Sequence, residues 1–186
     1  MKRILPVLFA VACALSACAT PPHREVVVLR ATLAPPPSRV EAIPPPPASH
    51  FYWAAGHWKF DGGGYVWEPG RWVEPRVDQV YVQAYSSPRG NEWIYHPAHW
   101  QVVRDNGGVT LVTTAGPPPA PRIEAITPPP GVEFIWISGH WKFERNQYVW
   151  DAGHWERHHP GEHWLPAHWV QRGPGWNYMP GRWDVD

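Results

Sequence analysis

The chain has 186 residues, and its 16 Lys and Arg are balanced by 16 Asp and Glu. Without net positive charge it has no general attraction for a phosphate backbone, so nucleic acid is excluded as its main partner. Fourteen Trp and 25 Pro stand beside only two Met. An ordinary domain builds its core from Leu, Ile and Val, so aromatic rings have to fill that role here.

The N-terminus has the features of an export signal. A positive start and an apolar run over residues 4–15 are followed by Leu-Ser-Ala immediately before Cys18. The run is too short to cross a membrane as a helix. The Leu-Ser-Ala-Cys sequence resembles the bacterial lipobox, which implies cleavage before the cysteine. Residues 1–17 are therefore predicted to be a lipoprotein signal peptide.

The resemblance to the lipobox also implies that Cys18 is lipidated and becomes the mature N-terminus. Several acyl chains on one residue hold a protein stably on a bilayer. Ala19 follows, where an inner-membrane retention signal has Asp, so the resemblance favours a lipid-anchored, periplasm-facing position at the outer membrane. The other cysteine, Cys13, lies within the signal. The mature chain is thus expected to have no disulfide and no Cys-based zinc site.

Two Pro-rich stretches lie outside the regions with strand-like patterns. Residues 18–50 contain two runs of Pro, and residues 115–133 contain two more. Such composition is typical of extended, semi-rigid spacers. We expect the first stretch, apart from a short strand over residues 26–29, to lift the following domain off the membrane, and the second to link two modules.

An internal duplication organises the rest of the chain. When the chain is shifted by 83 positions, so that residue 39 aligns with residue 122, residues 39–100 lie on residues 122–183 without a gap. Both copies contain Arg-x-Glu-Ala-Ile, a run of Pro, and Gly-His-Trp-Lys-Phe. The sequence therefore predicts two tandem Trp-rich modules, over residues 51–114 and 134–186.

Each module repeats a Trp-x-x-Gly-x-Trp unit every 14 residues. An aromatic residue opens the eight units, at Trp53, Trp67, Tyr81, Tyr95, Trp136, Trp150, Trp164 and Tyr178. Gly or Ala holds the fourth position, and Trp closes every unit except the third, which has Ser86. On these residues the chain resembles the WXXGXW (also YXWGXW) repeat family of bacterial lipoproteins. The resemblance implies a repeat type and a location but no particular activity.

The repeat unit favours strands, because Pro and Gly lie inside it and its other residues are aromatic or β-branched. A turn centred on Gly62-Gly63, or on Arg145-Asn146 in the second module, pairs aromatic with aromatic residues and His with an acid. In the first module the pairs are Phe60 with Tyr65, Trp58 with Trp67, Trp53 with Trp72, and His57 with Glu68. Cross-strand aromatic pairs contribute about 0.2–1 kcal/mol each.

The predicted fold is all-β. Each module forms an antiparallel meander of four strands, the first module adds a hairpin over residues 102–112, and the two modules pack as a small sandwich or a closed barrel. Composition and pattern leave these two packings open.

The direction of the Trp rings decides their role. Trp53 and Trp58 are five positions apart, so a regular strand points them to opposite faces. A bulge at the Pro-Gly step would bring them to one face and make the rings core. Without it a row of rings remains for a ligand, with Trp53, Trp72, Trp136 and Trp155 as the candidates for stacking on a glycan. A tight turn over residues 68–71, giving smaller hairpins, is the third alternative.

The sequence contains no catalytic constellation, so we expect neither enzymatic activity nor a cofactor. The His–acid pairs are interpreted as solvated cross-strand pairs. Four histidines around one predicted turn are weak candidates for a metal site: His154, His158, His159 and His163. Imidazole suits zinc, copper and nickel. However, Arg replaces His beside the closing Trp in two units, at Arg71 and Arg182, and a ligand position would not accept Arg.

Three hypotheses about function follow. The first is a structural, assembly or interaction role in the cell envelope, with the membrane as partner through the lipid anchor. The second is a module that binds peptidoglycan or another envelope glycan through exposed Trp. The third and weakest is periplasmic metal binding through His. Exposed coplanar rings would favour the second, convergent histidines the third, and buried rings the first.

Overall fold

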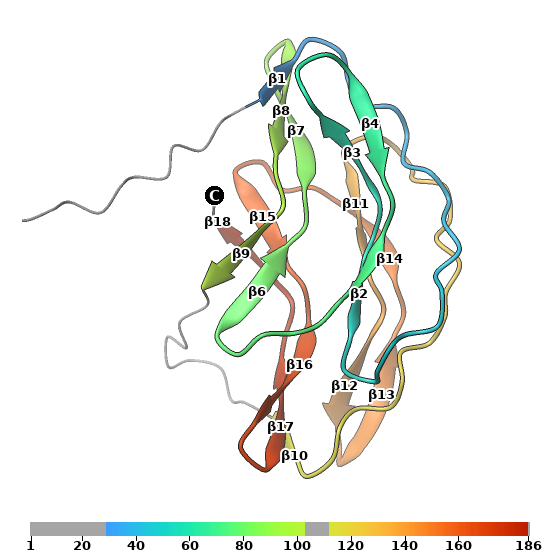
Figure 1. Cartoon of the computed structure of the whole chain (residues 1–186), viewed down its shortest axis with the longest axis vertical. Helices are drawn as coiled ribbons and strands as arrows, with labels where there is room; N and C mark the ends of the chain where they lie inside the picture. Colours follow the sequence, from blue (N-terminus) through green and yellow to red (C-terminus); the bar gives the residue numbers. More distant parts are fainter. Residues whose placement is uncertain (1–28, 103–111, 186) are drawn as a thin grey trace, which may run out of the picture.

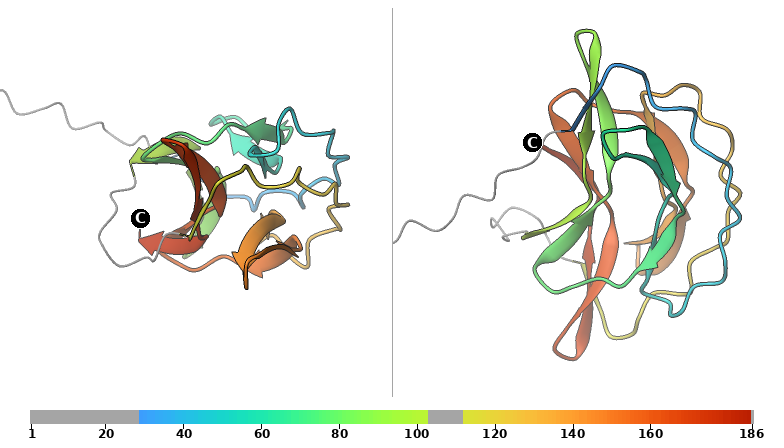
Figure 2. Two further views of the ribbon diagram at one scale, coloured as in Figure 1. Left: turned by 90° about the horizontal axis from the view of Figure 1, so that it is seen from below. Right: turned by 45° about the horizontal axis from the view of Figure 1, so that its top comes forward.

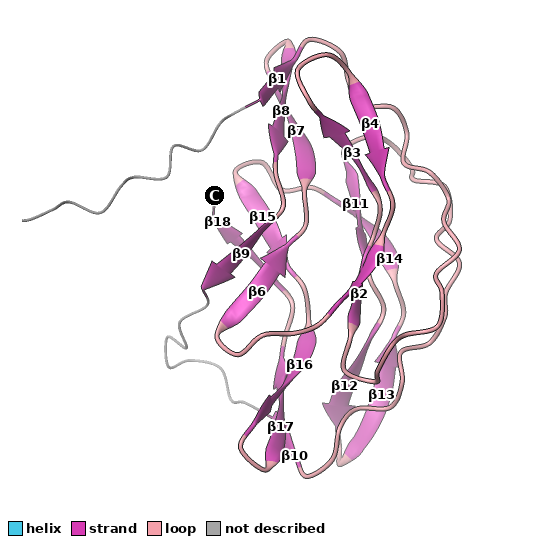
Figure 3. Cartoon of the chain, viewed as in Figure 1, coloured by secondary structure: helices cyan, strands magenta, loops and turns pink. Residues whose placement is uncertain are grey.

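The computed structural model describes residues 29–102 and 112–185, and every regular element in these ranges is a β-strand (Figures 1 and 3). The prediction of an all-β fold is confirmed. The signal peptide, Cys18 and most of the hairpin predicted over residues 102–112 lie outside the described residues. No helix among the described residues is long and apolar enough to cross a membrane.

The strands of the first half are β1 (Leu29–Ala31), β2 (Tyr52–Ala54), β3 (His57–Phe60), β4 (Tyr65–Glu68), β5 (Arg71–Val73), β6 (Gln79–Val82), β7 (Tyr85–Arg89), β8 (Glu92–His96) and β9 (His99–Val102). Those of the second half are β10 (Val112–Thr114), β11 (Phe134–Ile137), β12 (His140–Glu144), β13 (Gln147–Asp151), β14 (His154–Arg157), β15 (Glu162–Leu165), β16 (His168–Arg172), β17 (Gly175–Met179) and β18 (Arg182–Val185). Residues 29–102 and 112–185 are called copy one and copy two below.

Each copy consists of two long antiparallel hairpins. The first hairpin of copy one is β2–β5, in which β2 pairs with β5 and β3 with β4. The second is β6–β9, in which β6 pairs with β9 and β7 with β8. Copy two repeats this arrangement with β11–β14 and β15–β18.

The predicted registers are confirmed in both copies. Copy one pairs Trp53 with Trp72, Trp58 with Trp67, His57 with Glu68, and Phe60 with Tyr65. In copy two the turn falls on Arg145 and Asn146, whose φ angles of 49° and 64° suit the mirror-image hairpin turn.

The middle of each hairpin differs from the predicted bulge. In the first hairpin of copy one, Ala55-Gly56 and Pro69-Gly70 leave the ladder together, two residues on each strand. The register is therefore the same on both sides of the interruption, whereas a bulge would shift it by one residue. Because Pro69 has no N–H and both strands carry Gly there, the strands can twist apart without losing alignment. The tight turn over residues 68–71 does not form either.

The four-stranded meander also requires correction. Strand β5 does not pair with β6, so the two hairpins of a copy form separate ladders. A third strand instead joins each second hairpin, with β1 alongside β8 and β10 alongside β17. The predicted strand over residues 26–29 thus meets the structure only at Leu29, the first residue of β1. Among the described residues every sheet stays open, with two or three strands.

The Pro-rich stretches are not free spacers where the structure describes them. Residues 32–50 and 115–133 run antiparallel beside each other along one flank of the molecule, as the blue and yellow segments of Figure 1 show. A β-bridge joins Ala42 to Ala125 between them. Each stretch accepts hydrogen bonds from Trp side chains of the first hairpin in its own copy, for example Trp58 Nε1 to the Pro37 carbonyl at 3.0 Å. They are therefore part of the fold.

A pseudo-two-fold axis relates the two copies. Several contacts between them join residues 83 positions apart, as a two-fold axis requires. The Ala42–Ala125 bridge and the 3.1 Å hydrogen bond from Gln101 to Asp184 are two of these, and β6 packs against β15, its own counterpart. The left view of Figure 2 shows the first hairpin of copy one on one side and that of copy two on the other.

Two of the three clusters of buried hydrophobic residues join the copies across this axis. One cluster contains Trp53 and its counterpart Trp136, with Ile43 and Ile126 from the Pro-rich stretches. A second cluster, of Val80, Val82 and Leu165, joins β6 to β15. The two copies therefore pack face to face in the manner of a sandwich, and a third cluster, with Tyr52 and Tyr81, lies within copy one.

Candidate functional site

The four Trp predicted as a stacking row lie in the interior. Trp53 and Trp136 are only 7% and 8% exposed. Trp72 and Trp155 are half-buried and pack edge-on against them, with ring centroids 5.4 Å apart in both pairs. Such T-shaped pairs are favourable for aromatic rings but offer no flat surface to a sugar. Of the two interpretations that the sequence left open, this geometry is that of a core.

The same edge-on packing recurs in other Trp pairs. All 14 lie within the described ranges, and each is buried or half-buried. Trp58 packs on Trp67, Trp141 on Trp150, and Trp164 on Trp183, with interplanar angles of 66–70°. The Trp rings of these pairs thus pack against each other across neighbouring strands.

The glycine of the repeat unit makes room for these rings. A Cβ added at Gly70 would lie 2.4 Å from Cζ2 of Trp53, and one at Gly56 would lie 2.4 Å from Cζ2 of Trp67. The opening Trp of each unit therefore covers the glycine of the partner unit, reciprocally. Copy two repeats the pattern, and Trp164 covers Gly181 in the same way.

Alanine replaces glycine where the covering ring is a Tyr. Tyr81 packs on Ala98, and the same register places Tyr95 at Ala84 and Tyr178 at Ala167. In all eight units Trp is matched with Gly and Tyr with Ala, because the narrower phenol leaves space for one methyl group. In each repeat unit, the size of the aromatic ring on one strand therefore determines whether Gly or Ala lies beneath it on the paired strand.

Two carboxylates that the sequence analysis left without a role lock this arrangement. Glu41, from the Pro-rich stretch, accepts hydrogen bonds from the backbone N–H of Gly56 at 2.9 Å and of Gly70 at 3.0 Å, and from Trp67 Nε1 at 3.2 Å. Glu124 does the same for Gly153 and Trp150. These donors lie at the interruption of the ladder, so the carboxylate replaces the strand partners that they lack. The recurring Arg-x-Glu-Ala-Ile sequence was the signal.

The arginine of that sequence has a defined position too. The Arg39 guanidinium lies 4.7 Å from the ring centroid of Trp58, and Arg122 lies 5.0 Å from that of Trp141. This is cation–π geometry. The Pro-rich stretch is therefore attached by one cation, one carboxylate and several indole N–H donors.

The four histidines proposed for a metal do not converge. His159 pairs with Glu162 at 2.9 Å, and His154 lies 3.5 Å from Glu156. His163 instead contacts Gln101 of copy one at 2.6 Å, and His158 stacks on Tyr85 at 4.4 Å. Among the described residues there is no group of three His, Cys, Asp or Glu that could hold a metal ion.

The predicted His–acid pairs form, and in each the carboxylate is partly exposed whereas the imidazole is largely buried. His57 Nε2 lies 3.5 Å from Glu68, His140 Nε2 lies 3.8 Å from Asp151, and the two imidazoles are only 16% and 15% exposed. Burial lowers the pKa of both histidines, against the opposing effect of the neighbouring carboxylates. Each ring also lies parallel to a Tyr of the second hairpin. These neutral imidazoles join the two hairpins of a copy.

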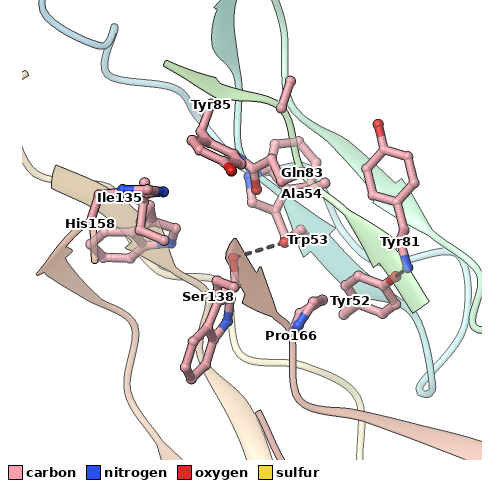
Figure 4. Close-up of a pocket in the computed structure, with 13 residues that line it drawn as sticks. Tyr52, Trp53, Ala54, Tyr81, Gln83, Tyr85, Ile135, Ser138, His158 and Pro166 are labelled. Atoms are coloured by element: carbon pink, nitrogen blue, oxygen red, sulfur yellow. Dashed lines mark hydrogen bonds between the residues drawn. The ribbon is translucent and has the colours of Figure 1, made fainter. Parts of the chain in front are cut away.

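A small cavity of about 40 Å³ lies between the copies close to the axis (Figure 4). Trp53 and Tyr52 line it from copy one, and Ser138 from copy two donates a 2.8 Å hydrogen bond to the Trp53 carbonyl. Tyr85 and His158 lie at one end. His158 also lines a second cavity between the copies, with a volume of about 430 Å³. Both of these cavities therefore lie between the copies rather than over a Trp row.

The fold and its repeat define a class: an all-β protein made of duplicated Trp-rich hairpins. The model of the WXXGXW repeat, in two copies, matches residues 51–73, 131–156 and 173–184. These segments of the chain are therefore WXXGXW repeats. The matched segments leave out the second hairpin of copy one, where Tyr and Ala replace Trp and Gly although the ladder is the same. Comparisons with curated proteins and with solved structures give no match.

Proposed function

We propose that this chain is a non-enzymatic interaction protein of the cell envelope, held at the periplasmic face of the outer membrane by a lipid on Cys18. The observation that carries the proposal is the use of the repeat residues. The Trp, the Gly that they cover and the two Glu that lock them all interlock inside the protein. The repeat therefore specifies a rigid scaffold, and its surface and grooves are left for partners.

Lipid attachment is tested by metabolic labelling with an alkyne-bearing fatty acid. The wild-type chain should take up label and fractionate with the outer membrane, and Cys18→Ala should do neither. An unlabelled wild-type chain in the soluble periplasmic fraction would refute the anchored location.

The scaffold part is tested by Trp fluorescence. The emission should be blue-shifted and resist acrylamide, because every ring is buried or half-buried. A large quenchable fraction in the folded chain would contradict the scaffold role. It would favour instead the hypothesis that a glycan stacks on exposed Trp rings.

Glycan binding is a second candidate, because the 430 Å³ cavity has the size of a small-molecule site, for which roughly 300–1,000 Å³ is usual. In this version the ligand binds between the copies rather than on Trp53, Trp72, Trp136 and Trp155. Sedimentation with purified peptidoglycan and with lipopolysaccharide tests it, using serum albumin as the control protein. A chain that remains in the supernatant with both would count against envelope glycans as ligands.

A further inference from the structure

The pseudo-two-fold axis creates two equivalent grooves between the copies, and they differ in size. The open groove lies between the β7–β8 turn region and residues that follow β14, and its outer cavity has a volume of about 430 Å³. Its counterpart, the closed groove, lies between the β16–β17 turn region and residues that follow β5. A cavity of only about 20 Å³ is left there. The two grooves lie at equivalent positions of the two copies, so the side chains that line them can be compared position by position.

The first difference is an ion pair. In the closed groove Arg172 binds Asp78 at 2.5 Å. The counterparts in the open groove are Arg89 and Gly161, both of which line its outer cavity. Arg89 makes no ion pair with any described residue, and its side chain is exposed. One groove is thus closed by a neutralised arginine, and the other presents an arginine without that carboxylate.

The second difference is the one irregular repeat unit. Trp169 closes its unit in copy two, is 3% exposed, and packs edge-on against Tyr148 of the first hairpin of that copy. Ser86 is its counterpart in copy one. The inner cavity lined by Ser86 has a volume of about 70 Å³, against about 20 Å³ for the equivalent cavity lined by Trp169. The inner and outer cavities of the open groove share His158 in their lining, so they adjoin.

Rings form the wall of the open groove. Tyr85 stacks between His96, at 4.3 Å, and His158 of copy two, at 4.4 Å. The counterpart of His96 in the closed groove is Met179, which lines the small cavity there. Trp58 and Ser86 add an indole and a hydroxyl to the inner cavity. A sugar ring needs this combination of apolar faces and hydrogen-bonding groups.

The charges at the mouth favour an acid group on the ligand. Arg89 and Arg157 both line the outer cavity. Arg157 lies 3.3 Å from Glu133, so it is partly neutralised, and Arg89 carries the remaining positive charge. Guanidinium groups bind carboxylates through paired, charge-assisted hydrogen bonds.

We infer that the open groove is a binding site for an acidic saccharide, whose ring packs against His96 and His158 and whose acid group binds Arg89. The inference rests on the second candidate of the proposed function, to which it adds a site and a ligand class. Ser86 in place of the closing Trp and Gly161 in place of the aspartate then open the site on one side of the axis.

The test is calorimetric titration of the full chain in detergent with three probes. These are trigalacturonate, its methyl ester, which keeps the sugar and removes the charge, and inorganic phosphate, which keeps a charge and removes the sugar. Trigalacturonate should bind, and the other two should bind at least about tenfold more weakly, since one charge-assisted hydrogen bond accounts for that factor or more. Equal binding of the ester or of phosphate would overturn the ligand class.

Restoring the symmetry of the copies locates the site. Gly161→Asp places a carboxylate where Asp78 already tolerates a φ of 59°, and it should weaken trigalacturonate binding at least about tenfold. Gly161→Asn has the same backbone requirement without the charge and should bind like wild type. Ser86→Trp should also weaken binding by filling the inner cavity, whereas Ser86→Ala should not. Unchanged binding in the folded Gly161→Asp chain would overturn the location.

The outcomes separate the inference from the proposed function. If the chain sediments with peptidoglycan but binds no trigalacturonate, or binds it equally well as Gly161→Asp, the inference fails and the proposed function stands. If the chain neither sediments with envelope glycans nor binds trigalacturonate, both glycan proposals fail.

Discussion

Copy one and copy two use the same hairpins but differ in how they fill the space between them. Their ladders, the Trp over Gly contacts and the attachment of the Pro-rich stretch recur at positions 83 apart. The residues that differ most, among them Ser86 against Trp169 and Gly161 against Asp78, line the two grooves. The comparison separates residues that build the repeat from residues that distinguish its two sides.

Trp169→Ser gives copy two the residue that copy one has, and it should lower the unfolding free energy more than any other substitution considered below. Trp169 is 3% exposed and donates a 2.8 Å hydrogen bond to the Trp141 carbonyl. Replacing a buried Trp by a small residue costs about 3–5 kcal/mol in unfolding free energy. Urea denaturation followed by circular dichroism measures it. A decrease in unfolding free energy below about 1 kcal/mol would mean that neighbouring residues fill the space left by the indole without loss of stability.

Glu124→Ala should have the next largest effect. It leaves the Gly153 N–H and Trp150 Nε1 without their acceptor, and unsatisfied groups of this kind cost about 1–3 kcal/mol each. We expect a loss of about 3 kcal/mol, with Glu41→Ala giving a similar loss in copy one. Glu133→Ala, which removes a carboxylate from a half-exposed ion pair, is the control and should cost much less. Equal losses for Glu133→Ala and Glu124→Ala would contradict the locking role.

Gly153→Ala tests the packing rule. The added methyl would lie 2.4 Å from Cζ2 of Trp136, and overpacking of this kind costs about 1–3 kcal/mol. In the Trp136→Tyr background the same substitution should cost less, because the chain itself combines Tyr with Ala in three units. A double-mutant cycle on the unfolding free energies measures the coupling. Additive losses would show that ring size and the residue beneath it are independent.

The smallest effect concerns pH. Burial lowers the pKa of His57, His140 and His168 in the folded chain below the unfolded value of 6.5. Their stabilising contribution is complete above pH 6.5 and is lost as the pH falls below it. The urea midpoint should therefore decrease from pH 8 to pH 5. His168 has Tyr85 as its counterpart, so His168→Phe should reduce this pH dependence, whatever its effect on stability at pH 8. If the urea midpoint of His168→Phe depends on pH as strongly as that of wild type, His168 does not contribute to the pH dependence.

The hairpins could be predicted from the sequence because their partners are close in the chain and alike. One turn position aligned four aromatic or His–acid pairs at once, and the duplication repeated the alignment. The interruption in the middle could not be predicted, since Pro and Gly at one step suit a bulge and a symmetric break equally well.

The Pro-rich stretches were misjudged because their partners are distant. Nothing local shows that Glu41 meets Gly70, 29 residues away, so composition alone favoured a spacer. The Trp53 and Trp136 rings were likewise ambiguous until the axis brought them together. The open groove was beyond prediction, because it depends on how two copies pack, although the irregular unit at Ser86 marked its place in advance.

The axis between the copies allows the two sides of the chain to differ. Contacts such as Gln101 with Asp184 and Ala42 with Ala125 are those of an isologous homodimer, now formed within one polypeptide. A homodimer of identical subunits must carry two identical grooves, because any substitution appears on both sides. Within one polypeptide that constraint is absent. One groove can be closed while the other stays open, so the single chain has a polarity that a homodimer of identical subunits cannot have.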